Sequence, residues 1–149
     1  MGIQSIDCRG DSPSNVRIVA MTNTGYLLSY YKGHWTDRKV HEKFGLCSVM
    51  SHDGKYLATG GSDAKIRLFG LEEQSMFELH TFFDAKLKWI WNLQFSFDNQ
   101  FLFVASSDGI VQMWSLKDKQ VKRFYRGHEK SVVSLSLFEV RQRERQQPS

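Results

Sequence analysis

The sequence predicts an all-β protein built from repeated four-stranded antiparallel sheets. Three observations carry this prediction: the chain repeats itself after 45 residues, its apolar runs are short, and Gly, Asp, Asn and Ser separate these runs. Short apolar runs between turn-forming residues are typical of strands. A helical solenoid of similar repeat length needs longer helical segments, so we reject that alternative.

The clearest repeat aligns residues 51–69 with residues 96–114 without a gap. Each segment contains a polar turn, an apolar strand, a tight turn and a second strand that ends in an aromatic residue. A weaker copy lies in residues 16–31, at an offset of 39, where Tyr30 takes the aromatic position. The matching pairs of the two clear copies are Asp53 and Asp98, Asp63 and Asp108, and Phe69 and Trp114.

The strands of each unit follow from their residues. The strand after the polar turn is almost continuously apolar, which indicates that both of its faces are covered. Asp forms the tight turn that follows, because its side chain caps the turn backbone. A fourth, more exposed strand completes the unit. The expected strands are Tyr56–Thr59, Ile66–Phe69 and Met76–Leu79 in one copy, and Phe101–Ala105, Ile110–Trp114 and Val121–Phe124 in the other.

Four short antiparallel strands in such a repeat are typical of a β-propeller blade. A blade cannot bury both sheet faces alone, so it stacks on its neighbours. We expect residues 1–138 to form a partial propeller and to self-associate, or to need a missing N-terminal half, because two blade faces stay uncovered. The expected blades are at about 1–44, 45–88 and 89–126, followed by a closing strand at 131–138 and a disordered basic tail at 139–149.

The repeats resemble WD repeats, although they keep only parts of that family's signature. Trp114 takes the place of the WD tryptophan, and Gly127-His128 follows thirteen residues later. WD repeats form a hydrogen-bonded tetrad of His, a strand Ser or Thr, a turn Asp and a strand Trp. No unit has the full set, so we expect packing to dominate over polar contacts. The residues assigned to this framework are Thr59, Asp63, Phe69, Asp108, Trp114 and His128, whereas Gly33-His34 is interpreted as a loop outside the motif.

Three segments resemble one WD-repeat family more closely. They are Trp89-Ile90-Trp91, the turn 105–108, and Gly127-His128 with the following 131–133. The family is lethal-with-Sec-thirteen, the small WD-repeat subunit of TOR kinase complexes, also called G-protein-β-subunit-like. The resemblance implies a non-catalytic scaffold that binds a TOR-type kinase and its accessory subunits. The alternative is a generic WD-repeat adaptor in a ubiquitin ligase, trafficking or RNA-processing assembly.

The motifs argue against an enzyme, a cofactor or a metal site. The five histidines lie apart from one another and from both cysteines, so no metal-ligand spacing occurs. The chain has no Gly-x-Ser-x-Gly, phosphate loop or dinucleotide glycine pattern. Cys8 and Cys47 are interpreted as buried thiols at equivalent positions of neighbouring blades, too far apart for a disulfide.

The net charge of +4 allows nucleic-acid binding, but the basic residues gather near the C-terminal end, where a solvated edge explains them. Nucleic acid is therefore the weakest of the three partner hypotheses. No apolar segment is long enough to cross a membrane, and the N-terminus lacks a signal-peptide core. The expected location is the cytoplasm.

Aromatic and arginine residues are the candidate protein contacts, because Trp, Tyr and Arg are typical interface anchors. Trp89 and Trp91 precede or enter an inner strand and, two residues apart, point the same way. Either both are buried against a neighbouring blade or both line the face of the propeller. The candidate contact residues are Trp35, Trp89, Trp91, Tyr125 and Arg126.

Overall fold

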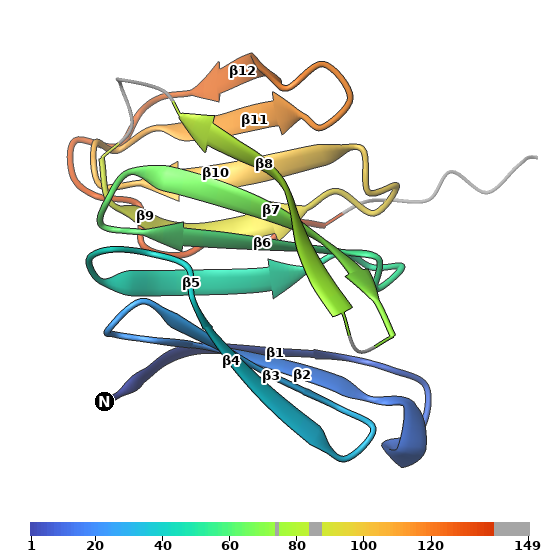
Figure 1. Cartoon of the computed structure of the whole chain (residues 1–149). Coiled ribbons are helices and arrows are strands. Elements are labelled where there is room, and N and C mark those ends of the chain that lie inside the picture. Colours follow the sequence, from blue (N-terminus) through green and yellow to red (C-terminus); the bar gives the residue numbers. More distant parts are fainter. Residues whose placement is uncertain (74, 84–87, 139–149) are drawn as a thin grey trace, which may run out of the picture.

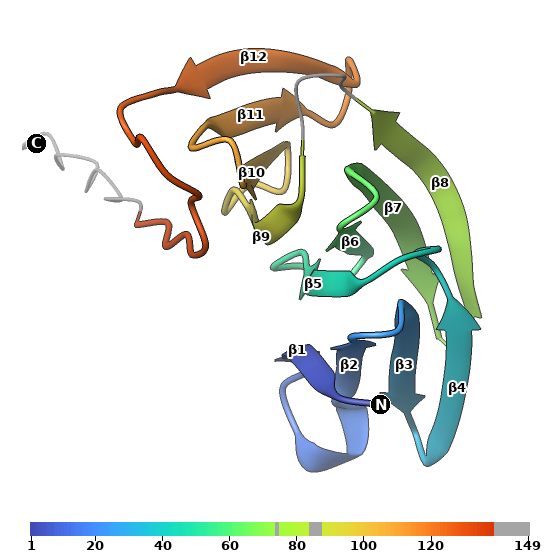
Figure 2. The ribbon, with the colours of Figure 1, turned by 90° about the vertical axis from the view of Figure 1, so that its left-hand side faces the viewer.

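The computed structural model describes residues 1–73, 75–83 and 88–138. In this part of the chain, twelve strands form three four-stranded antiparallel sheets, and the predicted all-β propeller blades are confirmed. Figure 2 shows the three sheets as blades that fan out around a common centre. The one helix of the described residues, η1 at Pro13–Asn15, has three residues and cannot cross a membrane.

Within each blade the strands lie side by side in chain order, from the innermost to the outermost (Figures 1 and 2). The innermost strands are β1 (Ile3–Arg9), β5 (Gly45–Met50) and β9 (Ile90–Phe95). The second strands are β2 (Arg17–Thr22), β6 (Tyr56–Gly61) and β10 (Phe101–Ser106), and the third are β3 (Tyr26–Tyr31), β7 (Lys65–Glu72) and β11 (Val111–Ser115). The outermost strands are β4 (His34–Lys39), β8 (Ser75–Phe83) and β12 (Gln120–Tyr125).

The core fills the spaces between neighbouring blades. One apolar cluster joins blades two and three, and in it the ring of Phe82 meets that of Trp114 edge-on at 5.2 Å. A second cluster joins blades one and two and contains Phe69. Leu57 and Ala58 in β6, and Val104 and Ala105 in β10, are completely buried. Neighbouring strand residues point to opposite faces, so both strands are covered on both faces, as predicted. Each buried leucine or valine stabilises the fold by about 1.5–3 kcal/mol.

The predicted closing strand at 131–138 is wrong, because no strand forms over these residues. A strand needs a hydrogen-bonded neighbour, and no described strand pairs with this segment. Only its start is fixed: the Val132 N–H donates to the Ser106 carbonyl at 3.2 Å, and the Ser131 hydroxyl donates to the Ser107 carbonyl at 3.0 Å. The predicted tail at 139–149 lies outside the described residues.

The predicted equivalence of the two cysteines is also wrong. Cys8 pairs with Ile18, whereas Cys47 pairs with Gly60, so the two occupy different registers. The loop between β1 and β2 is longer than its counterpart in blade two, so the 39-residue offset does not extend back to β1. Cys8 is exposed and Cys47 is buried, and both are free thiols. Burial raises the pKa of Cys47 to about 12, which keeps this thiol protonated at neutral pH.

Candidate protein-binding face

Blade two contains a buried hydrogen-bonded network that holds its inner turn. The His41 side chain is completely buried, its Nδ1 lies 3.0 Å from both Asp63 carboxylate oxygens, and its Nε2 lies 2.9 Å from Thr59 Oγ1. The Asp63 carboxylate also accepts the Lys65 N–H at 3.1 Å. Phe69, at the tryptophan position, is buried but has no group to donate. The sequence prediction assigned Thr59 and Asp63 to this framework and missed His41.

A repeated tripeptide could have identified His41. His-Glu-Lys occurs at 41–43 and again at 128–130, after Gly127. In both copies the backbone closes over the turn glycine of the preceding blade: a Cβ on Gly25 would lie 2.1 Å from the His41 carbonyl oxygen, and a Cβ on Gly109 would lie 2.5 Å from that of His128. His128 therefore follows blade three as His41 follows blade one, but its side chain is exposed.

The pKa of Asp63 reports the same network. Burial is the largest single influence on the pKa of this carboxyl and would raise it, but the contributions that lower the pKa together outweigh burial, first among them the hydrogen bond and charge of His41. The Lys65 N–H and the charge of Arg67 act in the same direction. The pKa of Asp63 therefore lies below its ordinary value, and the carboxylate stays ionised in the folded protein at neutral pH.

Blade three uses other polar contacts at the matching positions. Val104 stands where Thr59 stands in blade two, and the Trp114 indole N–H instead donates to Gln112 Oε1 at 2.9 Å. Gln112 is completely buried. Asp108 keeps its turn role, because its carboxylate accepts the Ile110 N–H at 3.1 Å. The prediction that no blade holds a complete WD tetrad therefore agrees with these contacts.

An exposed group of aromatic side chains lies where blades two and three meet. We call Phe44, Trp89 and Trp91 the aromatic face. Phe44 is 56% exposed and Trp89 is 43% exposed, and their ring centroids are 6.3 Å apart. Trp91 is half-buried, and its ring centroid is 5.6 Å from that of Trp89. Trp89 and Trp91 thus lie together, as their spacing predicts, with Trp89 open to solvent.

Two equivalent serines fix the backbone of the aromatic face. The Phe44 N–H donates to Ser62 Oγ at 3.0 Å, and the Phe44 carbonyl accepts the Ser62 N–H at 2.9 Å. Trp89 makes the same pair of bonds with Ser107, at 3.2 and 3.0 Å. Both backbone polar groups of each aromatic residue are therefore satisfied, and the rings are presented from a fixed position.

The other predicted contact residues lie elsewhere. Trp35 is in β4, where it is 63% exposed and its ring centroid is 5.0 Å from that of Tyr30. Tyr125 ends β12, and Arg126 follows it, with its guanidinium 5.4 Å from the centroid of the Phe124 ring. All belong to the outer rim, whereas the aromatic face lies at the start of the innermost strands: Phe44 and Trp89 directly precede β5 and β9, and Trp91 is in β9. Lys32 and Gly33 form the hairpin turn between β3 and β4, and His34 starts β4. Gly33-His34 thus lies between the two outer strands of blade one, in agreement with its interpretation as a dipeptide outside the motif.

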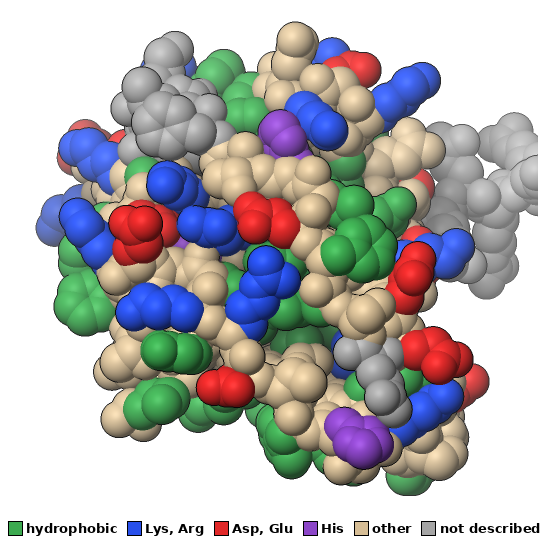
Figure 3. All heavy atoms as spheres, viewed as in Figure 1, with side chains coloured by type: hydrophobic (Ala, Val, Ile, Leu, Met, Phe, Trp, Pro, Cys, Tyr) green, Lys and Arg blue, Asp and Glu red, His purple; other side chains and the backbone are tan. Residues whose placement is uncertain are grey.

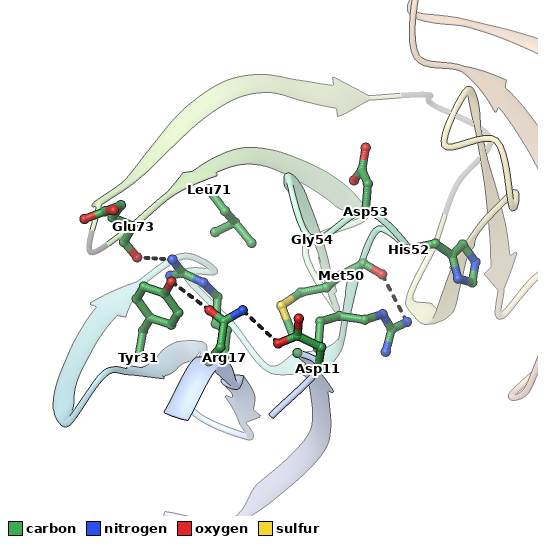
Figure 4. Close-up of a pocket in the computed structure, with 12 residues that line it drawn as sticks. Asp11, Arg17, Tyr31, Met50, His52, Asp53, Gly54, Leu71 and Glu73 are labelled. Atoms are coloured by element: carbon green, nitrogen blue, oxygen red, sulfur yellow. Dashed lines mark hydrogen bonds between the residues drawn. The ribbon is translucent and has the colours of Figure 1, made fainter. Parts of the chain in front are cut away.

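A cavity of about 490 Å³ is lined by residues of blades one and two (Figure 4). Arg17 is almost buried in its wall, with its guanidinium 4.4 Å from the centroid of the Tyr31 ring, and it donates to the Glu73 carbonyl. Arg9 donates to the Met50 carbonyl at 3.3 Å. Arg9 and Arg17 of blade one thus bind backbone of blade two, so we interpret these contacts as a tie between blades. Within the described residues, no three His, Cys, Asp or Glu side chains are placed to hold a metal ion.

The strand order, the turn aspartates and the stacked blades define a β-propeller repeat protein. A family model described as "WD domain, G-beta repeat" matches residues 25–70 and 77–115. The chain belongs to the WD40 repeat family. Propellers of this kind are generally non-catalytic scaffolds, which agrees with the absence of catalytic motifs from the sequence.

Several curated relatives share this repeat. The chain is 31% identical over 100 residues to telomerase protein component 1 of Rattus norvegicus, covering 66% of this chain and 4% of the relative. It is 27% identical over 108 residues to the U3 snoRNP-associated protein-like EMB2271 of Arabidopsis thaliana, covering 72% and 22%. It is 33% identical over 102 residues to the E3 ubiquitin-protein ligase COP1 of Arabidopsis thaliana, covering 66% and 15%. The chain thus spans less than a quarter of each relative.

A solved structure supports the same fold. The structure of U3-55K superposes with a TM-score of 0.74 at 24% sequence identity, and the match covers 87% of this chain and 41% of that one. The similarity extends across all three blades, so the repeat order and the stacking are those of a propeller.

Proposed function

We propose that this chain is a non-catalytic WD-repeat adaptor in the cytoplasm and that its aromatic face binds a partner protein. The observation that carries this proposal is the pair Phe44 and Trp89, two large exposed rings in contact across the boundary between blades two and three. Exposed aromatic groups on a rigid scaffold are typical of binding hot spots. The serine bonds described above hold the backbone of both residues in place, which lowers the entropy lost on binding.

The charge beside the aromatic face supports a partner with acidic groups at its rim. Lys43 precedes Phe44, Lys88 precedes Trp89, and both lysines are exposed. A lysine thus precedes an aromatic residue at both equivalent positions, which gives the surroundings of the aromatic face a positive charge. Rim charges of this kind steer association and contribute less to affinity than the buried rings.

The relatives favour a general adaptor role. By name they are a telomerase protein component, a U3 snoRNP-associated protein and an E3 ubiquitin-protein ligase, so the repeat occurs in proteins of different roles. None of these three is named as a subunit of a TOR complex. Binding to a TOR-type kinase and its accessory subunits is the second candidate. It rests on the resemblance of Trp89-Ile90-Trp91, the turn 105–108, and Gly127-His128 with the following 131–133.

The test compares two kinds of exposed aromatic residue. The double variant F44A/W89A removes the aromatic face, and W35A removes an exposed ring from the outer rim as a matched control. Proteins recovered by affinity purification and identified by mass spectrometry should be the same for wild type and W35A and lost for F44A/W89A. Circular dichroism melting should show that all three fold.

The outcome also separates the two candidates. Recovery of a TOR-type kinase that depends on Phe44 and Trp89 would support the kinase-binding role, and recovery of other assembly subunits with the same dependence would support the general adaptor. Equal recovery by wild type and F44A/W89A would overturn the proposed binding face.

A further inference from the structure

A groove of about 940 Å³ lies between blades two and three, at the outer rim and away from the innermost strands that carry the aromatic face. It is bordered by the outer strand of blade two, by the third strand of blade three and by the turn between β11 and β12. Its floor is mainly apolar. The floor residues are Tyr56, Leu68 and Leu79 of blade two, and Phe101, Met113 and Leu116 of blade three.

The rim of the groove is positively charged. Lys117, Lys119, Lys122 and Arg123 line it, and Asp118 is the one acidic residue among its described lining residues. Figure 3 shows Lys and Arg side chains gathered over the turn between β11 and β12, with one acidic side chain among them.

Three of the four cations form no ion pair with a carboxylate in the part of the chain that the structure describes. Asp118 pairs with Lys122 at 2.7 Å, so this carboxylate neutralises one cation. Lys117, Lys119 and Arg123 form no ion pair with another described residue. His80, on the opposite wall, senses the same charge: its pKa is lowered first by burial and then by the charge of Lys119. The groove therefore has an uncompensated positive field over an apolar floor.

The shape and chemistry of the floor favour a peptide over a nucleic acid. Single-stranded nucleic acids bind on exposed aromatic rings, where the bases stack. Here most floor side chains are aliphatic or methionine, and Tyr56 and Phe101 are only partly exposed. Leu and Met surfaces accept apolar side chains of varied shape. The cations also cluster on one turn and do not follow a long backbone path.

Charge disfavours two other occupants. The chain's own residues 139–149 carry three arginines and two glutamates, so this segment is itself basic. A second copy of the chain carries a net charge of +4, which opposes docking against a basic rim.

We infer that this groove binds an acidic, amphipathic peptide segment of a partner protein. Its apolar side chains would lie on the floor between Leu79 and Met113, and its carboxylates would pair with Lys117, Lys119 and Arg123. The inference is independent of the aromatic face, because the two surfaces share no residue.

Fluorescence anisotropy of a labelled peptide with the full chain tests the inference. The probe is a short peptide in which glutamates alternate with leucine and valine, and its controls are a Glu-Ser peptide and a Lys-Leu peptide. We expect the Glu-Leu/Val peptide to bind. Both control peptides should bind at least about tenfold more weakly, because the Glu-Ser peptide lacks the apolar contact with the floor and the Lys-Leu peptide lacks the ion pairs with the rim. Added salt should weaken the binding.

Matched variants locate the site. K117E/K119E should lower the affinity for the labelled peptide about tenfold or more. K32E/K39E makes an equal change of charge on blade one and should leave this affinity unchanged. L79S should weaken it through the floor without a change of charge, and it serves as the second variant if K117E/K119E fails to fold. F44A/W89A should bind the probe like wild type, which separates this groove from the proposed adaptor face.

Three results would overturn the inference. They are equal binding of the Glu-Ser and Glu-Leu/Val peptides, equal weakening by K117E/K119E and K32E/K39E, and displacement of the probe by a single-stranded oligouridylate at lower concentration than by unlabelled peptide. The last result would assign the groove to RNA.

Discussion

Blades two and three have the same strand order and the same turn aspartate, but they fix their inner parts with different polar contacts. Blade two uses His41, Thr59 and Asp63 and has Phe69 at the aromatic position. Blade three keeps Trp114 and pairs its indole with Gln112. Each blade thus holds a different part of the WD tetrad. The difference indicates that packing between blades defines the fold, and that the polar contacts are interchangeable additions.

The largest effect should come from truncating the aromatic residue in either blade. Phe69 and Trp114 are both almost fully buried, at 1% and 5% exposure. We expect F69A and W114A each to lower the free energy of unfolding by about 3–5 kcal/mol, because each leaves a large cavity between blades. Urea denaturation followed by circular dichroism measures this change.

The comparison of the two variants is the informative part. Similar losses would show that packing outweighs the indole hydrogen bond. W114A could instead lower the free energy of unfolding more than F69A does, by more than the contribution of one hydrogen bond. That result would contradict the view that packing dominates.

The next effect should come from the buried histidine. H41A leaves Thr59 and Asp63 without their shared partner in a buried site, and this change should cost about 1–3 kcal/mol. H128A is the matched control, because His128 occupies the equivalent place after blade three but its ring is exposed; its cost should stay within about 0.5 kcal/mol. Equal costs in urea denaturation would show that the network of blade two adds no stability.

The histidine also shows what the sequence could and could not predict. The repeat of 45 residues and the turn aspartates predicted three blades and the strands β6, β7, β10 and β11, because local residue patterns determine short strands and turns. The closing strand at 131–138 was predicted from its alternating pattern, but pairing depends on a neighbouring strand that a local pattern cannot supply. His41 was missed because its partner Asp63 lies 22 residues away and no glycine precedes it.

The candidate site was predicted in part for a similar reason. Trp89 and Trp91 were identified from their residue type and their spacing of two residues. Phe44 was not, because its contact with Trp89 joins two blades and needs the stacking to be known. Trp35, Tyr125 and Arg126 were proposed as contacts of the same kind, but the strand order places them on outer strands.

A smaller effect should follow from removing only the indole hydrogen bond of blade three. W114F keeps most of the packing against Phe82 and loses the donor to Gln112. We expect a loss of about 0.5–1.5 kcal/mol, the net worth of one hydrogen bond. The same urea experiment measures it, with W114A as the reference. A loss as large as that of W114A would show that the hydrogen bond, and not the ring, stabilises blade three.

The smallest effect should appear in the dependence of stability on pH. The pKa of Asp63 is lower in the folded protein than in the unfolded chain, so the unfolded chain binds its proton first as pH falls. The stabilising contribution of Asp63 is therefore complete above the unfolded pKa of about 3.9 and is lost as pH falls through the lower folded value. D63N lacks this group, so the difference in urea midpoint between wild type and D63N should shrink below about pH 4. H41A removes the main cause of the lowered pKa. The difference in urea midpoint between H41A and H41A/D63N should therefore shrink less below about pH 4 than the difference between wild type and D63N. A constant difference in urea midpoint between wild type and D63N from neutral pH to pH 3 would contradict this prediction. The network of blade two would then stabilise the Asp63 carboxylate no more than solvent stabilises an exposed aspartate, and the two blades would differ in packing alone.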